Sequence, residues 1–547
     1  MSSGHDDSTC SSVDERADTS GRGRAGLNRR RFLQTTAALT AAAGGSGAGI
    51  ASPGKAAAAA AQESIEEVIV ALGADTRVMD PDLDQGLNDM YRLIFNTPLS
   101  VDDEGLPVAD LAESWEFADD TTLRLMLRQD AVWQDGEPLT ADDFVFTWER
   151  MNDPERESTN VQGFSPWLAD VIAIDDYTVE MRTSVPYAPA LVELDGFWIA
   201  PRHFIEEVGD EAFGLKPLGS GPYQVVEWQK DQFLSLEAAS TWWGEPQPFP
   251  RVRFVIIPDT FTRAAALLAG DAHVVSEPPV AMVPQIEGSG TAYVTQAPDW
   301  RIQFIQFPHQ DSRRENTPEI DNKLVRQALN YALDREAIAT AVGQGNFDVV
   351  PGPWFGSSWA YPANAAELGY RYDPERAREL LAEAGYADGF TFYFGTSNGF
   401  SLMDNELMQA CVPYFQDIGL QVEFTSLEWA AFDPARDENQ FSAYYLGLSG
   451  STDPHGSPNQ YMTSQGRTRG FYDTDPELEE VIWQGATIVD FEERQTYYQE
   501  VIFPMMIDVA PWIFLWTPSS IMAVDNRIEY QQGPQPYVEV MKMTAAG

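Results

Sequence analysis

The chain has 547 residues, 44% of them hydrophobic, which is enough to fill the cores of two or three domains. Its 84 acidic and 35 basic residues give a formal net charge of −49. This charge excludes a nucleic-acid-binding surface, because binding to a polyphosphate depends on Lys and Arg displacing counterions.

The basic residues are nearly all Arg, and Lys occurs only at positions 55, 216, 230, 323 and 542. An acidic surface poor in Lys suits a protein kept soluble in concentrated salt. At ~1 M salt the Debye length falls to roughly 3 Å, which screens the self-repulsion of the chain. We therefore expect a halophilic source, with an ordinary acidic exported protein as the alternative.

Residues 29–34, Arg-Arg-Arg-Phe-Leu-Gln, precede the apolar stretch TTAALTAAAGGSGAGIA. Together they resemble a twin-arginine export signal, which is an address that the export machinery reads. The stretch is too short and too rich in Ala and Gly to span a membrane. We expect cleavage between Ala51 and Gln62, so that residues 1–61 form the signal and a flexible N-terminus. The alternative is a disordered basic patch.

Cysteines are few: Cys10 precedes the arginines and Cys411 lies far beyond them. No Cys follows the signal at the place where a lipid anchor would be attached. One Cys remains after processing, so no internal disulfide can form. The neighbours Met408 and Val412 favour a buried helical thiol at Cys411. The processed chain also lacks an apolar run of membrane-spanning length, and we expect it outside the cytoplasm, in the periplasm or at the cell surface.

The first half of the chain alternates strands with short helices. Residues 66–72 (EEVIVAL) predict a buried strand, and Asp80-Pro81 opens a loop before a helix over 87–95. Residues 123–133 (LRLMLRQDAVW) alternate as a strand does, and the turn at 135–138 leads to a helix that begins after Thr140. Later strands are expected at 171–181, 221–228, 233–238 and 252–257, followed by a helix over 262–269 that ends at Gly270.

The second half follows a helix–strand alternation that predicts an α/β part. A strand at 303–307 leads into the polar loop DSRRENTPEID, which we interpret as a crossing between two parts of the chain. Helices are expected over 324–333, from Pro374 to Gly385 and over 405–418. Strands are expected at 390–394, 421–424 and, last, 512–516, which would return to the first part.

Six segments carry a family resemblance in a fixed order. The longest is 111–150 (LAESWEFADDTTLRLMLRQDAVWQDGEPLTADDFVFTWER), and the others are 217–228 (PLGSGPYQVVEW), Trp-Trp-Gly at 242–244 together with 251–275, 325–338, 372–390 and 418–429. In this order the chain resembles the family 5 extracellular solute-binding proteins, the peptide- and nickel-type (cluster C) binding components of ABC importers. The resemblance runs from about Glu66 to beyond Trp516.

The resemblance implies an α/β fold of the type II periplasmic-binding-protein class, with two lobes around a cleft and an α+β domain inserted in the first lobe. Mapped onto this chain, lobe I would be 64–99, 216–310 and 500–547, the insertion 100–215, and lobe II 311–499. Such proteins close by hinge motion around a small solute and deliver it to the transmembrane subunits of an ABC permease. We expect a monomer.

Four segments are expected to line the cleft, because the resemblance implies a ligand enclosed between the lobes. They supply Asp84, Gln85 and Asn88 after the first strand, and Ser220 between two glycines that allow close backbone approach. They also supply Trp354 and Trp359 in the segment from Pro351, and Ser449, Ser451 and Asp453 in the segment 447–456 (GLSGSTDPHG). The alternative for each Trp is a place in the core.

The segment 447–456 departs from the peptide-binding pattern of the family. In peptide-binding relatives an Asp here pairs with the α-amino group of the ligand, whereas this chain has Ser451 at that place and Leu448 in place of Trp. A buried ammonium group without a carboxylate partner is costly. We therefore expect a neutral polar ligand or a short saccharide rather than a dipeptide. Asp453-Pro454 is interpreted as turn chemistry.

No catalytic, cofactor or metal motif is found. The histidines are scattered, and there is no HExxH, CxxC, Walker or G-x-S-x-G string. We expect no cofactor, no metal and no enzymatic activity. His455 leaves a nickel role open on the evidence of one residue, and an exported acidic hydrolase is the alternative function.

Overall fold

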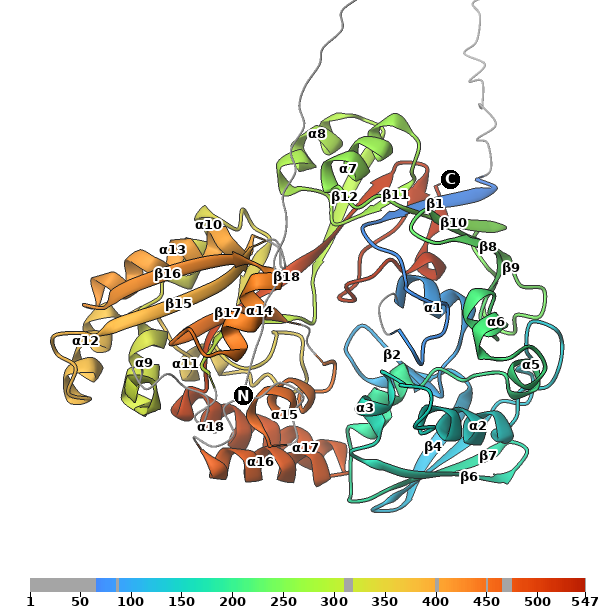
Figure 1. Cartoon of the computed structure of the whole chain (residues 1–547), viewed down its shortest axis with the longest axis horizontal. Coiled ribbons are helices and arrows are strands. Elements are labelled where there is room, and N and C mark those ends of the chain that lie inside the picture. The colour runs from blue at the N-terminus through green and yellow to red at the C-terminus, as the bar shows by residue number, and fades with distance from the viewer. Residues whose placement is uncertain are drawn as a thin grey trace, which may run out of the picture. The chain divides into compact units, whose positions relative to one another are not determined.

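The computed structural model of the chain describes residues 65–84, 88–308, 318–398, 403–448, 451–464 and 475–546 (Figure 1). Its main feature is a twelve-stranded sheet with the order β16-β15-β17-β13-β18-β11-β1-β10-β9-β8, to which β12 and β14 are joined through β18. The strands are β1 (Glu67–Leu72), β8 (Tyr223–Gln229), β9 (Phe233–Ala238), β10 (Arg251–Ile256), β11 (Val274–Ser276), β12 (Ala292–Pro298), β13 (Ile302–Gln306), β14 (Phe347–Val349), β15 (Thr391–Asn398), β16 (Gln421–Glu428), β17 (Ala443–Leu448) and β18 (Trp512–Asp525).

The strands around β1 make one half of this sheet. β1 is parallel to β10 and β11, and its side chains Val68 and Val70 are fully buried in a core that also takes in Tyr91, Tyr223 and Phe254. The helices of this half are α1 (Asn88–Ile94), α7 (Thr260–Ala269), α8 (Val283–Gly288) and the 3-10 turn η2 (Val280–Met282). The expected stop of the helix at Gly270 is confirmed, because that residue caps α7 in the left-handed region at φ 80°.

A separate four-stranded antiparallel sheet has the order β4-β5-β7-β6. The alternation expected at residues 123–133 is present up to Leu127, where β5 ends, and its side chains are buried in turn. Asp143 accepts a hydrogen bond from the Thr140 amide and so fixes the start of α2. The strands between residues 99 and 215 are β2 (Leu99–Val101), β3 (Pro107–Ala109), β4 (Ala112–Asp119), β5 (Thr122–Leu127), β6 (Leu168–Asp175) and β7 (Thr178–Thr183). The helices of this part of the chain are α2 (Ala141–Met151), α3 (Val161–Phe164), α4 (Ala190–Glu193), η1 (Leu194–Gly196), α5 (Arg202–Val208) and α6 (Asp210–Leu215).

The third part has the expected α/β character. β15 is parallel to both β16 and β17, and α13 and α14 pack on β15 and β16. Cys411 lies fully buried in α13, as expected, and burial raises the pKa of its thiol to about 12. The helices are η4 (Pro318–Asp321), α9 (Lys323–Tyr331), α10 (Arg335–Ala341), α11 (Ala365–Leu368), α12 (Pro374–Glu383), α13 (Asp404–Asp417), α14 (Trp429–Asp437), α15 (Gly456–Met462), α16 (Pro476–Thr487), α17 (Phe491–Tyr497), the π-helical turn η6 (Tyr498–Ile502) and α18 (Phe503–Val509).

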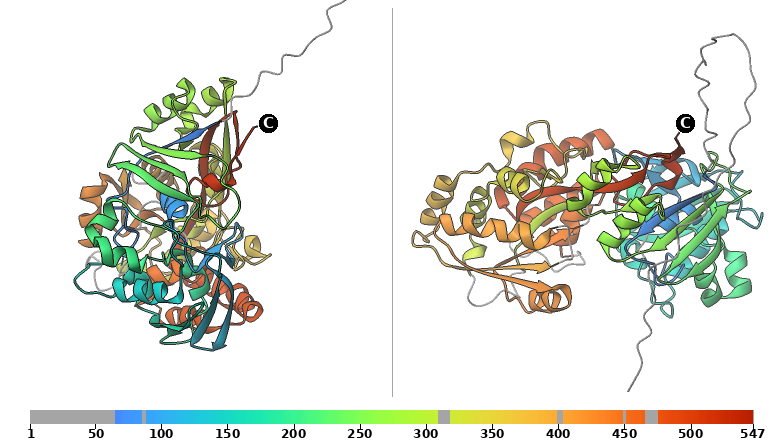
Figure 2. Two further views of the ribbon diagram at one scale, coloured as in Figure 1. Left: turned by 90° about the vertical axis from the view of Figure 1, so that its right-hand side faces the viewer. Right: turned by 90° about the horizontal axis from the view of Figure 1, so that it is seen from above.

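β18 joins the two halves of the large sheet. Its first residues pair with β13 and β14, its later residues pair with β12 and β11, and all 14 residues are buried. The right-hand view of Figure 2 shows this long red strand passing from one group of strands to the other. The chain ends with β19 (Ile528–Glu529), η7 (Val540–Lys542) and β20 (Thr544–Ala545).

The predicted domain limits stay a prediction, although the packing bears on one of them. Phe503, Trp512 and Trp516, which follow the predicted limit at 499/500, pack in the core formed by the third part of the chain. The later residues Met522 and Val524 pack in the core around β1. β18 itself therefore contributes to both cores.

Candidate ligand-binding site

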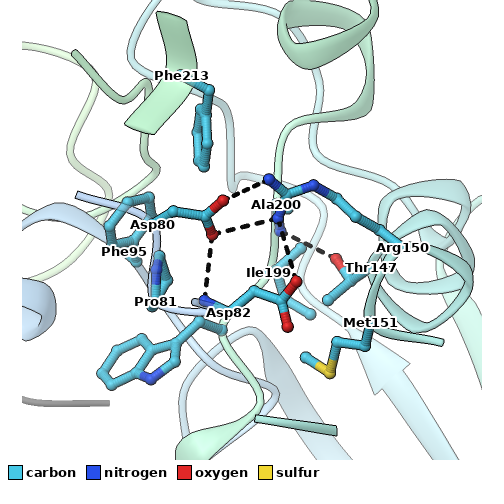
Figure 3. A pocket seen from close by; sticks show the side chains of 11 residues that line it. Asp80, Pro81, Asp82, Phe95, Thr147, Arg150, Met151, Ile199, Ala200 and Phe213 are labelled. Atoms are coloured by element: carbon cyan, nitrogen blue, oxygen red, sulfur yellow. Dashed lines mark hydrogen bonds and ion pairs between the residues drawn. The ribbon is translucent and has the colours of Figure 1, made fainter. Parts of the chain in front are cut away.

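The loop that follows β1 is held by buried ion pairs. Figure 3 shows the carboxylates of Asp80 and Asp82 directed toward the guanidinium of Arg150, which is 5% exposed and approaches Asp80 to 2.5 Å. Arg156 pairs with the same two carboxylates at 3.0 and 3.2 Å. The cavity beside them measures about 10 Å³, the space of one water. This cluster therefore anchors the loop to α2 and its neighbours and leaves no room for a solute.

The predicted site residues of this loop have internal partners. Asp84 is 8% exposed and accepts hydrogen bonds from the Thr76 hydroxyl at 3.0 Å and the Arg77 amide at 2.6 Å. Asn88 is the half-buried first residue of α1. Gln85 lies outside the described residues. The Asp84 carboxylate thus organises its own loop.

The Gly219-Ser220-Gly221 segment packs directly on α1. Ser220 is 2% exposed and donates to the side-chain oxygen of Asn96 at 2.9 Å. A Cβ atom at Gly219 would lie 1.8 Å from the carbonyl oxygen of Ile94. The close backbone approach expected of these glycines is present, and the group approached is the last turn of α1.

Three of the predicted residues lie together around Arg494. Its guanidinium binds both carboxylate oxygens of Asp453 at 2.7 Å, and the two side chains are 5% and 1% exposed. It also lies 5.1 Å from the ring centre of Trp359. Trp354 is 2% exposed and donates from its indole to the carbonyl of Pro454 at 2.9 Å. These contacts fix the loop that begins at Ser451.

Ser451 itself is half-buried and packs on the start of α15. A Cβ atom added at Gly456 would lie 2.1 Å from the Cβ of Ser451. The expected turn is confirmed, because Asp453 accepts a hydrogen bond from the amide of His455 at 2.9 Å. Ser449 lies outside the described residues.

The carboxyl group of Glu193, at the end of α4, lies near the loop that begins at Ser451. Tyr187 donates its hydroxyl to Glu193 at 2.7 Å, and its ring meets the fully buried His455 edge-on at 5.8 Å. Burial raises the pKa of Glu193 to about 7 and lowers the pKa of His455 to about 4. Both side chains are therefore favoured in their neutral forms.

A cavity of about 430 Å³ lies where β12, β14 and β18 meet. We call it the hinge cavity, and its size is within the about 300–1,000 Å³ typical of ligand sites. Its polar lining residues are Asp103, Asp299, Asp348, Ser357, Tyr361 and Thr517. The segment from Pro351 to Trp359, which was expected in the cleft, contributes Phe355, Gly356 and Ser357 to the lining, whereas the predicted residues Trp354 and Trp359 do not line this cavity.

Two of the three carboxylates of the hinge cavity are neutralised. Asp299 is 1% exposed and binds Arg301 at 2.5 Å, and Asp103 binds Lys542 at 2.7 Å. Asp348 is exposed, and the hydroxyl of Thr517 is buried without a hydrogen-bond partner among the described residues. The cavity thus offers hydroxyl groups and carboxylate acceptors to a polar solute.

Sequence reasoning missed the polar residues of the hinge cavity. Asp299 and Thr517 lie more than 200 positions apart, and only the pairing of β12 with β18 brings them together. Asp348 stands three residues before Pro351, where the predicted cleft segment begins. Its position beside the Pro-Gly-Pro turn is the sequence signal from which it could have been predicted.

The described residues contain no group of three or more His, Cys, Asp or Glu side chains that could hold a metal ion. Within the same part of the chain no helix is both long and apolar enough to cross a membrane.

Comparisons with known proteins agree with this architecture. The family model for bacterial extracellular solute-binding proteins, family 5 (middle part), matches residues 107–469. Heme-binding protein A of Haemophilus influenzae is 28% identical over 465 residues, which are 78% of this chain and 82% of that protein. The dipeptide-binding protein of Escherichia coli is 25% identical over 383 residues, which are 65% and 70% of the two chains.

The structure of HbpA2 from Haemophilus parasuis superposes on this chain with a TM-score of 0.76 at 24% identity, covering 88% of this chain and 100% of that one. This likeness shows the expected two-lobe, type II binding-protein fold.

Proposed function

Because this chain belongs to family 5 of the bacterial extracellular solute-binding proteins, we propose that it captures a neutral, hydroxyl-rich solute, such as a short saccharide, between its two lobes. Proteins of this family bind small solutes and deliver them to ABC permeases. The names of the relatives, heme-binding and dipeptide-binding, differ in ligand, so the ligand class has to be argued from the residues of this chain.

One observation supports a ligand without a charged amine. Asp84 and Asp453, the carboxylates of the predicted cleft loops, both have internal partners: the Thr76 hydroxyl and Arg77 amide for Asp84, and Arg494 for Asp453. Ser451 stands where peptide-binding relatives have an Asp. A captured α-amino group would find no unpaired carboxylate in these two loops, and a desolvated ammonium without such a partner is costly.

The hinge cavity supports the same class. Ser357, Tyr361 and Thr517 supply hydroxyl groups, and Asp348 supplies an acceptor for a sugar hydroxyl. Each neutral hydrogen bond contributes only ~1 kcal/mol net, so several must act together with the exclusion of water.

Titration calorimetry with a panel of free dipeptides and a panel of neutral oligosaccharides tests the proposal. We expect saturable oligosaccharide binding that weakens in Asp348→Asn, and weak or no dipeptide binding. Submicromolar dipeptide binding that disappears when the amine is blocked would contradict it, because some carboxylate would then act as the clamp. The alternative, an exported acidic hydrolase, would turn over the panel compound during the titration.

We further propose export by the twin-arginine route, supported by Arg29-Arg30-Arg31-Phe32-Leu33-Gln34, which lie outside the described residues. Changing Arg29 and Arg30 to Lys should retain the uncleaved chain in the cytoplasm. Wild-type export in cells that lack the twin-arginine translocase would contradict this route.

A further inference from the structure

The helix α16 supplies side chains to two separate cores. Leu478 and Ile482 pack in the core of the third part. Ala486 is fully buried in the core of the part that carries the four-stranded sheet, and Trp483 packs against that same core. Residues three or four apart are neighbours on a helix surface, so the two pairs form adjacent apolar stripes, one for each part of the molecule.

The last turn of α16 is also hydrogen-bonded to the part with the four-stranded sheet. The amide of Ala188 donates to the carbonyl of Ala486 at 2.8 Å. This carbonyl is among the last four of the helix, which have no partner within the helix itself. Water can bond to both groups when they separate, so the hydrogen bond can break at a small net cost.

The ring of His455 contacts an aromatic ring from each part. Tyr187, which precedes α4, meets it edge-on at 5.8 Å, and Trp483 meets it at 5.3 Å. His455 is fully buried and Tyr187 is 2% exposed. Edge-to-face rings attract one another beyond the area that they bury. We call these three residues, together with Ala188 and Ala486, the α16 contact.

The loop that carries His455 is fixed to the third part. Asp453 accepts a hydrogen bond from the amide of His455 at 2.9 Å, and both of its carboxylate oxygens bind Arg494 of α17. Both partners of Asp453 therefore belong to the third part, so the loop moves with α16 and α17.

The part with the four-stranded sheet is tied to the other half of the molecule, around β1. Arg150 of α2 binds Asp80 in the loop after β1 at 2.5 Å. The side chain of Gln134 donates to the carbonyl of Tyr223 in β8 at 2.8 Å. The four-stranded sheet and the strands around β1 therefore move together, and the α16 contact lies between this assembly and the third part.

A smaller contact lies beside the first. A Cβ atom added at Gly105, in the turn between β2 and β3, would lie 3.0 Å from the methyl carbon of Thr452. Val101 of β2 packs against the core of the third part. The two assemblies thus face one another along the loop that begins at Ser451, which the family resemblance places at the solute.

We propose that the α16 contact is a latch, which holds the two lobes together in the closed molecule and has to open before a solute can enter or leave. It differs from β18, which runs through both halves of the large sheet and cannot separate. The latch rests on the lobe closure of the proposed function, but it does not rest on the chemistry of the solute.

Double electron–electron resonance on the full chain, without added solute, tests the latch. Glu149 of α2 and Glu492 of α17 are exposed, and replacing both with Cys provides one spin-label site on each assembly. Cys10→Ser removes the other accessible thiol, because Cys411 is fully buried. Circular dichroism verifies that each labelled chain is folded.

We expect a shorter and a longer distance between the labels to coexist in the wild type. The ratio of the shorter to the longer should fall at least about tenfold in Tyr187→Ala, as expected when a buried aromatic contact is lost. Trp483→Ala, on the opposite side of the contact, should have the same effect. Tyr177→Ala is the control, because it removes the same side chain from the turn between β6 and β7 and should leave the ratio unchanged.

A wild-type chain without the shorter distance would overturn the latch, and so would a ratio that stays the same in both latch variants. An equal fall in Tyr177→Ala would also overturn it, because the effect would then come from a weakened core. These outcomes are separate from the calorimetry of the proposed function. If no oligosaccharide binds but the ratio falls as expected, the proposed solute is wrong and the latch stands.

Discussion

At the scale of single residues, Arg494 explains why Asp453 is present in a loop of otherwise small residues. The pair is almost fully buried and bidentate, so it holds the loop against Trp359 and α17. Removing one partner of a buried pair leaves the other charge uncompensated, which costs about 3–5 kcal/mol.

We therefore expect Asp453→Asn to lower the free energy of unfolding by about that amount, measured by denaturant titration at high salt. Arg376→Gln is the control, because the partner of Arg376, Glu379, is exposed on the same helix face. Equal losses in the two variants would show that burial does not set the strength of the Asp453 pair.

Glu193 should make stability depend on pH. Burial raises its pKa from 4.5 to about 7 in the folded chain. A carboxyl group with a raised folded pKa stabilises the fold fully below its unfolded pKa, and that contribution is lost as the pH rises through the folded pKa. The pKa of His455 is lowered from 6.5 to about 4, so its contribution is present above 6.5 and is lost as the pH falls. As the pH rises, the contribution of Glu193 to stability therefore falls while that of His455 grows.

Replacing Glu193 with Gln removes the pH-dependent contribution of Glu193 to stability and leaves that of His455. The free energy of unfolding of Glu193→Gln, minus that of the wild type, should increase by up to about 3 kcal/mol between pH 4.5 and pH 7. Other groups with shifted pKa values, Asp89 and Asp110 among them, are common to both chains and cancel. Denaturation at a series of pH values measures the difference in free energy of unfolding. A difference that does not change with pH would show that the pKa of Glu193 is not raised in the folded chain.

At the scale of elements, the junction between α1 and the segment before β8 depends on glycine. A Cβ at Gly219 would meet the Ile94 carbonyl oxygen at 1.8 Å, and the group it meets is backbone rather than the end of a flexible side chain. Gly219→Ala should therefore destabilise the fold by about 1–3 kcal/mol, the usual range of overpacking.

Gly163 in α3 supplies the matched substitution, because a Cβ there meets nothing within 4 Å. Gly163→Ala should be neutral or stabilising by up to about 1 kcal/mol, since Ala favours the helix. Thermal melting compares the two, and a harmless Gly219→Ala would mean that α1 can move away from this segment.

Sequence patterns predicted the elements far better than the site. β9 has the expected limits, α12 begins at Pro374, and α7 ends before Gly270, because local signals set those boundaries. The last strand was expected to end at Trp516, yet β18 continues to Asp525. Its later residues Thr517, Ser519 and Ser520 are polar, but pairing of Thr517 with β14 and of the two serines with β12 buries them.

The site was only partly predictable for a related reason. Trp354 and Asp453, both predicted to line the cleft, lie on neighbouring loops, because the Trp354 indole donates to the carbonyl of Pro454. The sequence carried no signal that Arg494, 41 residues after Asp453, would bind that carboxylate. An ion pair of this kind depends on the tertiary packing of α17 on the loop, and the periodicity of hydrophobic residues in the sequence does not predict it.

At the scale of the whole molecule, the net charge of −49 should make folding depend on salt. The Debye length is about 10 Å at 0.1 M salt and about 3 Å at 1 M, so repulsion between surface carboxylates is strong only at low salt. We expect the melting temperature to rise steadily with KCl. Sucrose is the control, because it is excluded from the surface without screening charge. A melting temperature that does not change with KCl would remove the proposal of a halophilic source.

The proposed function requires the two lobes to close on a solute. β18, which takes part in both cores, is the strand about which such a motion would turn. Small-angle X-ray scattering of the protein, with and without an oligosaccharide whose stoichiometric binding has been verified by calorimetry, tests this closure. If the lobes close, the radius of gyration is smaller in the bound state. An unchanged radius with the bound ligand at full occupancy would contradict it.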